Sequence, residues 1–204
     1  MLAAGAGSGD PVLVSGLLSG LVGADRRSPD SGEAAADHLN RLRAGVLGAN
    51  DGIVSVAAIV VGVAGATTHA GTILAAGLAA LTGGALSMAL GEYVSVSSQR
   101  DSQRATGAPE DEHVSPWSAA FASGISFLIG GVLPMLAMVL LPAAVRIPIT
   151  VAVVLVALAA TGAAGAALGG APVGRATIRV MIGGALALLV TFAIGSLLGT
   201  SGIA

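Results

Sequence analysis

The sequence predicts an all-α integral membrane protein with five transmembrane helices, and three observations support this fold class. Of the 204 residues, 54% are hydrophobic and only 10% are charged, which is far from the composition of an average soluble domain. The mean hydropathy is +0.90. Five apolar runs each have about the 20 residues that a helix needs to cross a bilayer. The chain has no cysteine, which excludes disulfides and thiolate metal sites, and no basic surface with interleaved aromatic residues indicates nucleic-acid binding.

The first segment of the chain differs from the rest. Residues 1–40 are rich in Gly, Ser, Asp and Pro, and we expect them to form a disordered cytoplasmic segment. Their apolar patch at 11–23 is too short to span a membrane, and no basic residues precede it as they would in a secretory signal. The transmembrane domain is therefore expected at 41–200.

The five spans follow in order, joined by short connections except for the polar loop 97–116. We expect them at about 44–66, 72–96, 117–141, 149–168 and 178–198. Gly and Ala are their filler, which favours close helix contacts. Gly48 with Gly52 in the first span, and Gly162 with Gly165 in the fourth, have helix-packing spacing. This spacing fits dimerisation as well as contact within one chain, and the sequence leaves both open.

Arginine placement predicts the orientation in the membrane. All nine basic residues are Arg, a usage typical of GC-rich genes, which suggests a bacterial source. The arginines near helix ends on one side are Arg41, Arg43, Arg100, Arg104, Arg175 and Arg179. The opposite side has only Arg146. By the positive-inside rule, the N-terminus and the 97–116 loop are cytoplasmic and the C-terminus is outside, here across a bacterial inner membrane.

Two polar residues interrupt the first span. Asn50 and Asp51 are the only strongly polar side chains between 44 and 66, and a charge in hydrocarbon costs roughly 3 kcal/mol on insertion scales. An Asp51 that merely capped a helix would leave only the segment 52–66 for the helix, which is too short to span. We therefore expect Asp51 to lie inside the membrane and to have a functional role.

A second carboxylate lies on a polar stripe of the second span. The stripe has helical spacing and consists of Met88, Gly91, Glu92, Ser95 and Gln99. Taken alone, it also fits a cytoplasmic helix end whose Glu92 side chain reaches water.

The register of the first two helices favours a shared site. His69 is the centre of the short connecting turn. Asp51 lies before His69 and Met88 lies after it, at almost equal distances along the chain. Antiparallel helices of equal rise place these two residues at one level, with Glu92 about one turn nearer the cytoplasm. Asp51, Met88 and Glu92 are therefore the predicted metal ligands. Asn50, Ser95 and Gln99 are secondary candidates.

The donor set indicates the kind of ion. Carboxylates alone suit Mg²⁺ or Ca²⁺, whereas an added thioether favours a softer ion such as Fe²⁺ or Mn²⁺; Met88 taken alone equally fits a core filler. Burial favours the protonated form of a carboxylic acid, and a bound metal displaces that proton. The site can then serve metal and proton in turn. No nucleotide-binding motif is present, so an ion or voltage gradient is the expected driving force, with no resident cofactor.

Two segments identify a family resemblance. LRAGVLGANDGIVSVAAIVVGVAGA, followed by GGALSMALGEYVSVSSQRD, resembles the vacuolar iron transporter family, closely over Leu42–Asp101 and by pattern over the remaining helices. The resemblance implies a homodimeric five-helix transporter with its ion path at the dimer interface, which exchanges cytosolic Fe²⁺ or Mn²⁺ for protons. It implies that Asp51 and Met88 are pathway ligands, and Glu92 falls in the matching motif. In a bacterium the equivalent process is export from the cytosol for metal homeostasis.

One departure from the family concerns the 97–116 loop. Many members carry a long, carboxylate-rich metal-binding domain at this position, and the short loop here resembles the nodulin-like branch. The loop retains an acidic cluster, formed by Glu110, Asp111, Glu112 and His113. A charged loop of this kind is usually only solvated.

Two other functions are alternatives to transport. In a non-transporting scaffold or accessory subunit, Asp51 and Glu92 would hydrogen-bond helices together. A membrane-embedded hydrolase would need a Ser–His pair at membrane depth, but all three His lie outside the expected spans. We therefore expect a transporter rather than an enzyme.

Overall fold

The computed structural model describes residues 29–107 and 114–201, with side chains from Asp37 onward, and its described part contains five helices and no strand. The helices are α2 (Pro29–Ala66), α3 (Ala70–Ala105), α4 (Pro116–Leu140), α5 (Arg146–Leu168) and α6 (Val173–Thr200). Each is long and apolar enough to cross a membrane. The predicted fold class, an all-α membrane protein with five spans, is confirmed.

The first two helices extend beyond the apolar runs that predicted them. α2 begins at Pro29 rather than near Ala44, and residues 1–28 lie outside the described part of the chain. α3 continues to Ala105 instead of ending near Val96. The end of an apolar run indicates where a helix leaves the membrane. The helix itself can continue further, because its backbone hydrogen bonds do not require apolar side chains. The acidic cluster of residues 110–113 also lies outside the residues that the structure describes.

A polar contact holds the early turns of α2 against α4. Asp37 accepts hydrogen bonds from the Ser115 backbone N–H at 3.1 Å and from the Ser118 hydroxyl at 3.0 Å. Arg41 lies one turn further along α2, with its Nε 3.5 Å from the Asp37 carboxylate. These contacts tie α2 to the start of α4.

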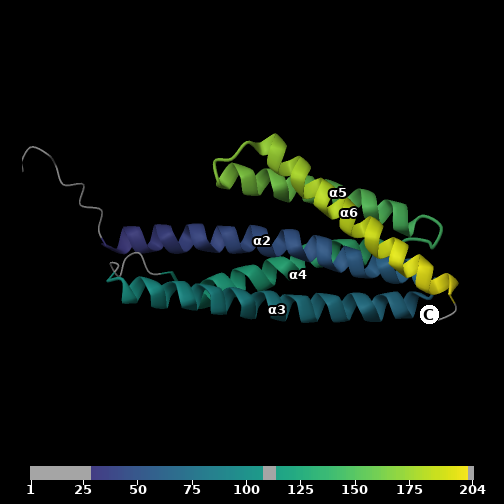
Figure 1. The fold of residues 1–204 in the computed structure, drawn as a ribbon, viewed down its shortest axis with the longest axis horizontal. Coiled ribbons are helices and arrows are strands. Elements are labelled where there is room, and N and C mark those ends of the chain that lie inside the picture. The colour runs from purple at the N-terminus through teal and green to yellow at the C-terminus, as the bar shows by residue number, and fades with distance from the viewer. Residues whose placement is uncertain (1–28, 108–113, 202–204) are drawn as a thin grey trace, which may run out of the picture.

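α2 is the central helix of the bundle. Within the described chain it is the one helix that packs against all four others, while α3 and α4 pack on one side and the α5–α6 hairpin on the other (Figure 1). The buried core includes Val56 and Val60 of α2, Phe127 of α4 and Leu158 of α5. Whatever α2 carries therefore borders every part of the domain.

Glycines bring α2 and α4 into backbone contact. A Cβ at Gly48 would meet the Ser123 backbone, and one at Gly52 would meet the Phe127 backbone. The Gly48/Gly52 spacing is thus used within one chain, which is one of the two interpretations that the sequence left open. We call this contact the α2/α4 seam.

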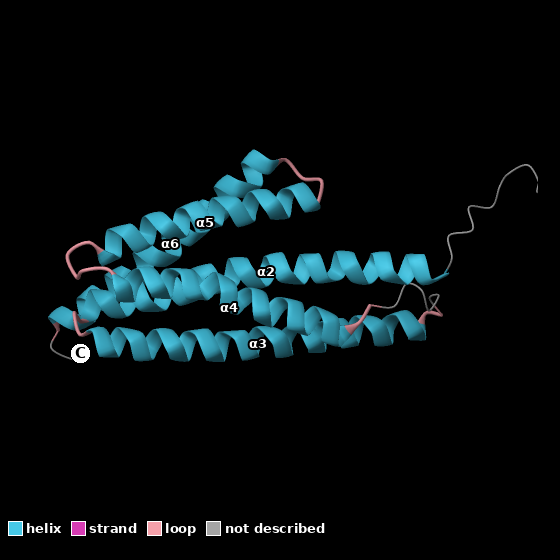
Figure 2. Cartoon of the chain, turned by 180° about the vertical axis from the view of Figure 1, so that it is seen from behind, coloured by secondary structure: helices cyan, strands magenta, loops and turns pink. Residues whose placement is uncertain are grey.

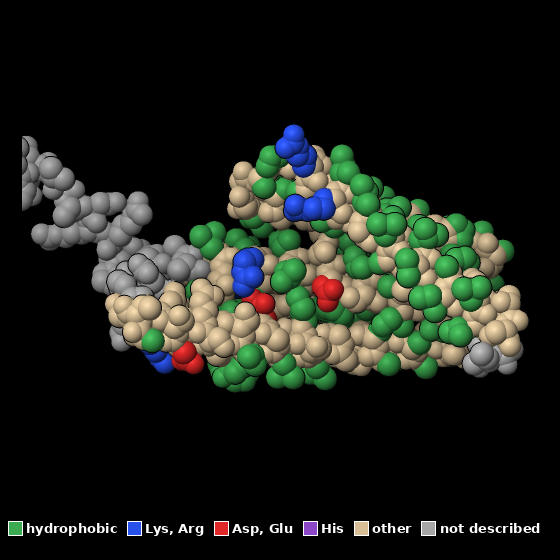
Figure 3. Space-filling view, viewed as in Figure 1, with side chains coloured by type: hydrophobic (Ala, Val, Ile, Leu, Met, Phe, Trp, Pro, Cys, Tyr) green, Lys and Arg blue, Asp and Glu red, His purple; other side chains and the backbone are tan. Residues whose placement is uncertain are grey.

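The two ends of the bundle differ in charge. The start of α2, the end of α3 and the α5–α6 loop lie at one end (Figure 2), and this end carries the six arginines that the sequence grouped together. Arg146 lies at the other end, where its side chain is buried and donates to the Thr68 carbonyl at 3.1 Å. On the face shown in Figure 3, hydrophobic side chains are spread along the helices and charged side chains are few, as expected for contact with lipid.

Candidate functional site

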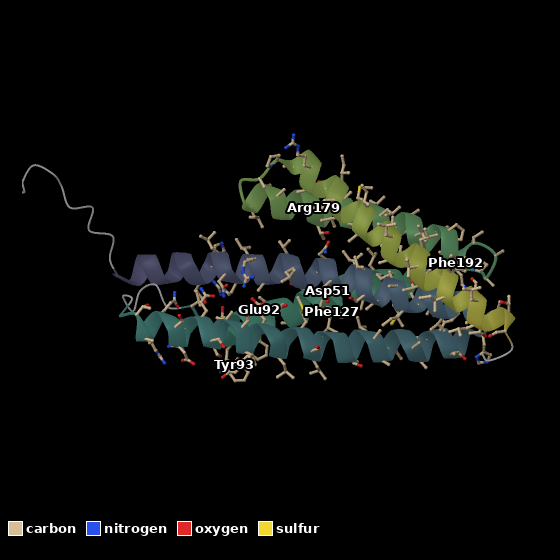
Figure 4. All side chains as sticks on the ribbon, in the orientation of Figure 1. Asp51, Glu92, Tyr93, Phe127, Arg179 and Phe192 are labelled. Atoms are coloured by element: carbon tan, nitrogen blue, oxygen red, sulfur yellow. The ribbon has the colours of Figure 1, made fainter. Side chains whose placement is uncertain are left out.

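A groove between α2 and α3 contains the three predicted ligands. Asp51 from α2 and Met88 and Glu92 from α3 all line this opening of about 490 Å³, whose inner wall includes Phe127. Figure 4 shows Glu92 nearer than Asp51 to the end where α2 begins. This agrees with the one-turn offset expected from the hairpin register.

Asp51 is half-buried near the middle of the Asp37–Ala66 span. Its carboxylate accepts a hydrogen bond from the Ser55 hydroxyl, one turn further along α2, at 3.0 Å. No arginine forms an ion pair with it among the residues that the structure describes. Asp51 is therefore a carboxylate at membrane depth with a neutral donor and an open side, an arrangement that leaves its oxygens available to a cation.

Glu92 has a cationic partner that was not predicted from the sequence. Arg43 Nη2 donates to Glu92 Oε1 at 2.7 Å and lies 3.3 Å from Asn40 Oδ1. The Glu92 side chain is 8% exposed and the Arg43 side chain 56%. Glu92 does not reach water as a snorkelling side chain would, because the guanidinium of α2 comes to it. Any cation that binds Glu92 must compete with Arg43.

Aromatic side chains mark the depth of Glu92. Tyr93, the next residue on α3, packs against Trp117 of α4 with ring centroids 4.6 Å apart, and Trp117 stacks on Phe121 at 6.0 Å. Tyr and Trp concentrate at membrane–water interfaces. Glu92 therefore lies beside an aromatic cluster and nearer than Asp51 to the arginine-bearing end of the bundle.

Met88 has two roles at once. It is partly buried and packs against the hydrophobic core, as a filler would, and it also lines the groove with the two carboxylates. Its thioether is thus in a position to be a weak, soft donor beside two hard ones.

The secondary candidates are not part of the groove. Asn50 lies on another side of α2, where its Oδ1 accepts a hydrogen bond from the Thr161 hydroxyl of α5 at 3.3 Å. Ser95 and Gln99 are exposed on α3, further toward its end, and do not line the opening. Ser95 and Gln99 share a helical stripe with Glu92, but α2 covers only the part of this stripe that includes Met88 and Glu92.

The groove of one chain offers few donors. Within the described ranges, no group of three or more His, Cys, Asp or Glu residues is placed to hold a metal ion. Two carboxylates and a thioether, open on one side, supply fewer ligands than octahedral oxygen sites use. Water or a second protein chain must complete the coordination of any ion that binds here.

Two of the three residues that the sequence analysis missed, Arg43 and Ser55, could have been found by counting positions along the helices. Arg43 lies before His69 and Glu92 lies after it, at similar distances along the chain. The hairpin therefore brings Arg43 and Glu92 to neighbouring levels. Ser55 follows Asp51 at the i, i+4 spacing of neighbours on one helix face. Phe127, which forms the inner wall, has no such signal because α4 has no register fixed by a short turn.

Comparison with known proteins gives consistent matches. The sequence profile of the VIT family matches residues 42–114 and 106–196. Vacuolar iron transporter homolog 5 of Oryza sativa subsp. japonica is 45% identical over 177 residues, covering 82% of this chain and 85% of the relative. Vacuolar iron transporter homolog 1 of Arabidopsis thaliana is 44% identical over 179 residues, covering 82% and 90%. Homolog 1 of the rice subspecies is 42% identical and covers 95% of this chain and 88% of the relative.

Proposed function

The chain belongs to the VIT family, and from that premise we propose that it transports Fe²⁺, Mn²⁺ or both across a membrane in exchange for protons. The names of its relatives describe transporters and not enzymes. The observation that carries the proposal is the groove in which Asp51, Met88 and Glu92 meet. Carboxylates that can bind either a proton or a divalent ion supply the chemistry that exchange requires.

The distribution of arginines supports a direction for this transport. Six arginines lie at one end of the bundle, and Arg146 at the other end is buried against a loop carbonyl. The first end is the cytoplasmic one by the positive-inside rule, which places the N-terminus inside and the C-terminus outside. A metal ion entering past Glu92 toward Asp51 moves away from the cytosol. In a bacterium this is export across the inner membrane.

A second copy of the chain would complete the site. On the α3 side of the groove, Gly83 and Gly91 are exposed, and a Cβ at either would meet nothing within 4 Å. Small residues of this kind allow close approach of another helix in a membrane. A homodimer that closes the two grooves on each other would bring a second Asp51 and Met88 to the ion.

A non-transporting scaffold is the second function to test. The Arg43–Glu92 pair, which joins α2 to α3, is the kind of contact that a scaffold would need. Asp51 does not fit this role, because its hydrogen-bond partner, Ser55, is on its own helix. A carboxylate that binds helices together should contact another helix.

Transport into proteoliposomes tests the proposal. Purified chain is reconstituted, a pH gradient is imposed, and uptake of Fe²⁺, Mn²⁺, Co²⁺ and Zn²⁺ is compared. We expect uptake of Fe²⁺ or Mn²⁺ that depends on the gradient and is abolished by Asp51→Ala or Met88→Ala without loss of assembly. Absence of flux in the wild type, or normal flux in both variants, would contradict transport through this groove.

A further inference from the structure

A second opening lies on the other side of α2, between α2 and the α5–α6 hairpin. At the end near Ala66 the helices touch closely: a Cβ at Gly62 would come within 3.3 Å of Thr191, and one at Gly65 within 3.1 Å of the Ser196 backbone nitrogen. Toward the arginine-bearing end the hairpin diverges from α2 (Figure 1). The space between them is a cavity of about 530 Å³, which we call the wedge.

The wedge combines apolar walls with a charged mouth. Val46 of α2, Leu168 of α5 and Val180 of α6 are among its apolar lining residues, and Arg43 and Arg179 line it as well. Space-filling Figure 3 shows a hollow between arginine side chains of α2 and of the α5–α6 hairpin. Its volume falls within the roughly 300 to 1,000 Å³ of ordinary ligand pockets. The lining thus suits a molecule with one anionic end and one hydrocarbon end.

The two arginines of the wedge differ in what they already bind. Arg43 is held by the Glu92 carboxylate at 2.7 Å. Arg179 is exposed, and it forms no ion pair with a carboxylate in the part of the chain that the structure describes. Arg175, one turn earlier on α6, is also exposed but does not line the wedge. Arg179 is therefore the cation of the wedge that is available to a ligand.

The surroundings favour a lipid over a soluble anion. The wedge lies within the spans near the arginine-bearing membrane surface, where a phospholipid presents its phosphate at headgroup level and its chains below. A guanidinium fork matches phosphate oxygens in two hydrogen bonds, and basic pockets between transmembrane helices bind anionic headgroups. A free phosphate would use Arg179 and leave the apolar walls unfilled.

We propose that the wedge binds one anionic glycerophospholipid, with its phosphate on Arg179 and an acyl chain between Val46, Leu168 and Val180. This site opens on another side of α2 than the α2/α3 groove, and the proposal does not depend on transport. A bound lipid occupies the space that otherwise separates the hairpin from α2. It thereby sets how far the two stand apart at this end.

Native mass spectrometry of the full-length chain tests the assignment. Delipidated protein is titrated with phosphatidylglycerol and with phosphatidylcholine of the same acyl chains, and bound lipids are counted. One basic residue near a membrane surface contributes about fivefold in affinity for anionic lipid. We expect wild type to prefer phosphatidylglycerol by about that factor and Arg179→Gln to lose the preference. Arg175→Gln removes the same charge one turn away and should keep the preference.

Further arms separate the lipid from other occupants. Ala176→Phe, which adds a ring at a half-buried wall position, should reduce binding of both lipids. Glycerophosphoglycerol, the same headgroup without acyl chains, should fail to compete. Equal binding of the two lipids by wild type, or equal losses in the Arg175 and Arg179 variants, would overturn the proposal. Full competition by the soluble headgroup, or a change in dimer formation in the Ala176 variant without a change in lipid binding, would also overturn it.

Discussion

The two sides of α2 that face α4 and α3 differ in how tightly they pack. On the α4 side, Gly48 and Gly52 bring backbones into contact and leave no space. On the α3 side, Asp51 and Ser55 face a groove that no other helix of the described chain fills. Two neighbouring faces of one helix therefore differ, one in close backbone contact with α4 and the other open and polar. The close contact of Gly48 and Gly52 with α4 fixes the part of α2 that carries Asp51.

The largest effect is expected from opening the α2/α4 seam. Gly52→Ala places a methyl against the Phe127 backbone, and overpacking of this kind should lower the free energy of unfolding by about 3 kcal/mol. The measurement is denaturation in detergent, followed through the single tryptophan, Trp117. Gly183→Ala on α6 is the matched control, because its Cβ would meet nothing within 4 Å and a helical Gly to Ala change should stabilise by about 0.5 to 1 kcal/mol. Equal effects of the two changes would contradict the seam.

Removal of the groove carboxylate should separate function from stability. Asp51→Asn should lower metal flux by about 100-fold or more, exceeding the roughly 10- to 100-fold typical of outer-shell changes at metal sites. The unfolding midpoint should stay the same or rise, because a costly charge leaves the membrane. Asn50→Ala is the control, since Asn50 lies outside the groove, and it should retain most of the flux. Loss of flux in both variants together with lower stability would favour a scaffold role.

Release of Glu92 from its partner should strengthen metal binding. Arg43→Gln removes the guanidinium that occupies Glu92 Oε1, and because Arg43 is more than half exposed, the gain in affinity should be modest, about fivefold. Calorimetric titration with Mn²⁺ measures it. Arg41→Gln, which removes a charge paired with Asp37 instead, should leave the affinity unchanged. Weaker binding in the Arg43 variant would show that the arginine positions Glu92 rather than competing for it.

An effect of similar size and opposite direction is expected at the hydrogen bond that orients Asp51. Ser55→Ala removes the hydroxyl that donates to Asp51 at 3.0 Å. It should raise the Mn²⁺ dissociation constant by about fivefold, which corresponds to roughly 1 kcal/mol for one hydrogen bond. Ser55→Thr keeps a hydroxyl at the same position and should restore the wild-type value. A Thr variant that behaves like the Ala variant would point to packing rather than to the hydrogen bond.

The sequence predicted the spans well but misplaced several helix ends. Hydropathy follows the membrane, so the five apolar runs were found. α2 and α3 continue past the membrane surface because Asp37 binds the start of α4 and because nothing in residues 97–105 breaks a helix. Glycine spacing could not decide between intrachain and interchain contact. The structure shows the Gly48/Gly52 pair within the chain.

The candidate site could be predicted as far as one hairpin determines it. A short turn fixes the relative level of Asp51, Met88 and Glu92, and these three line one groove. Asn50 was grouped with Asp51 because they are adjacent, yet successive residues of a helix point about 100° apart, and Asn50 faces α5. The Arg43 contact depends on side-chain direction, and the Phe127 wall on tertiary packing, neither of which follows from spacing.

X-ray absorption at the iron edge of the Fe²⁺-loaded protein tests the central claim most directly. The chain has no cysteine, so a sulfur neighbour of the metal can come only from methionine. We predict a shell of oxygen neighbours with a sulfur neighbour that disappears in Met88→Leu, and loss of bound iron in Asp51→Asn. A shell of oxygen and nitrogen alone, unchanged by Met88→Leu, would contradict the assignment of the α2/α3 groove as the metal site.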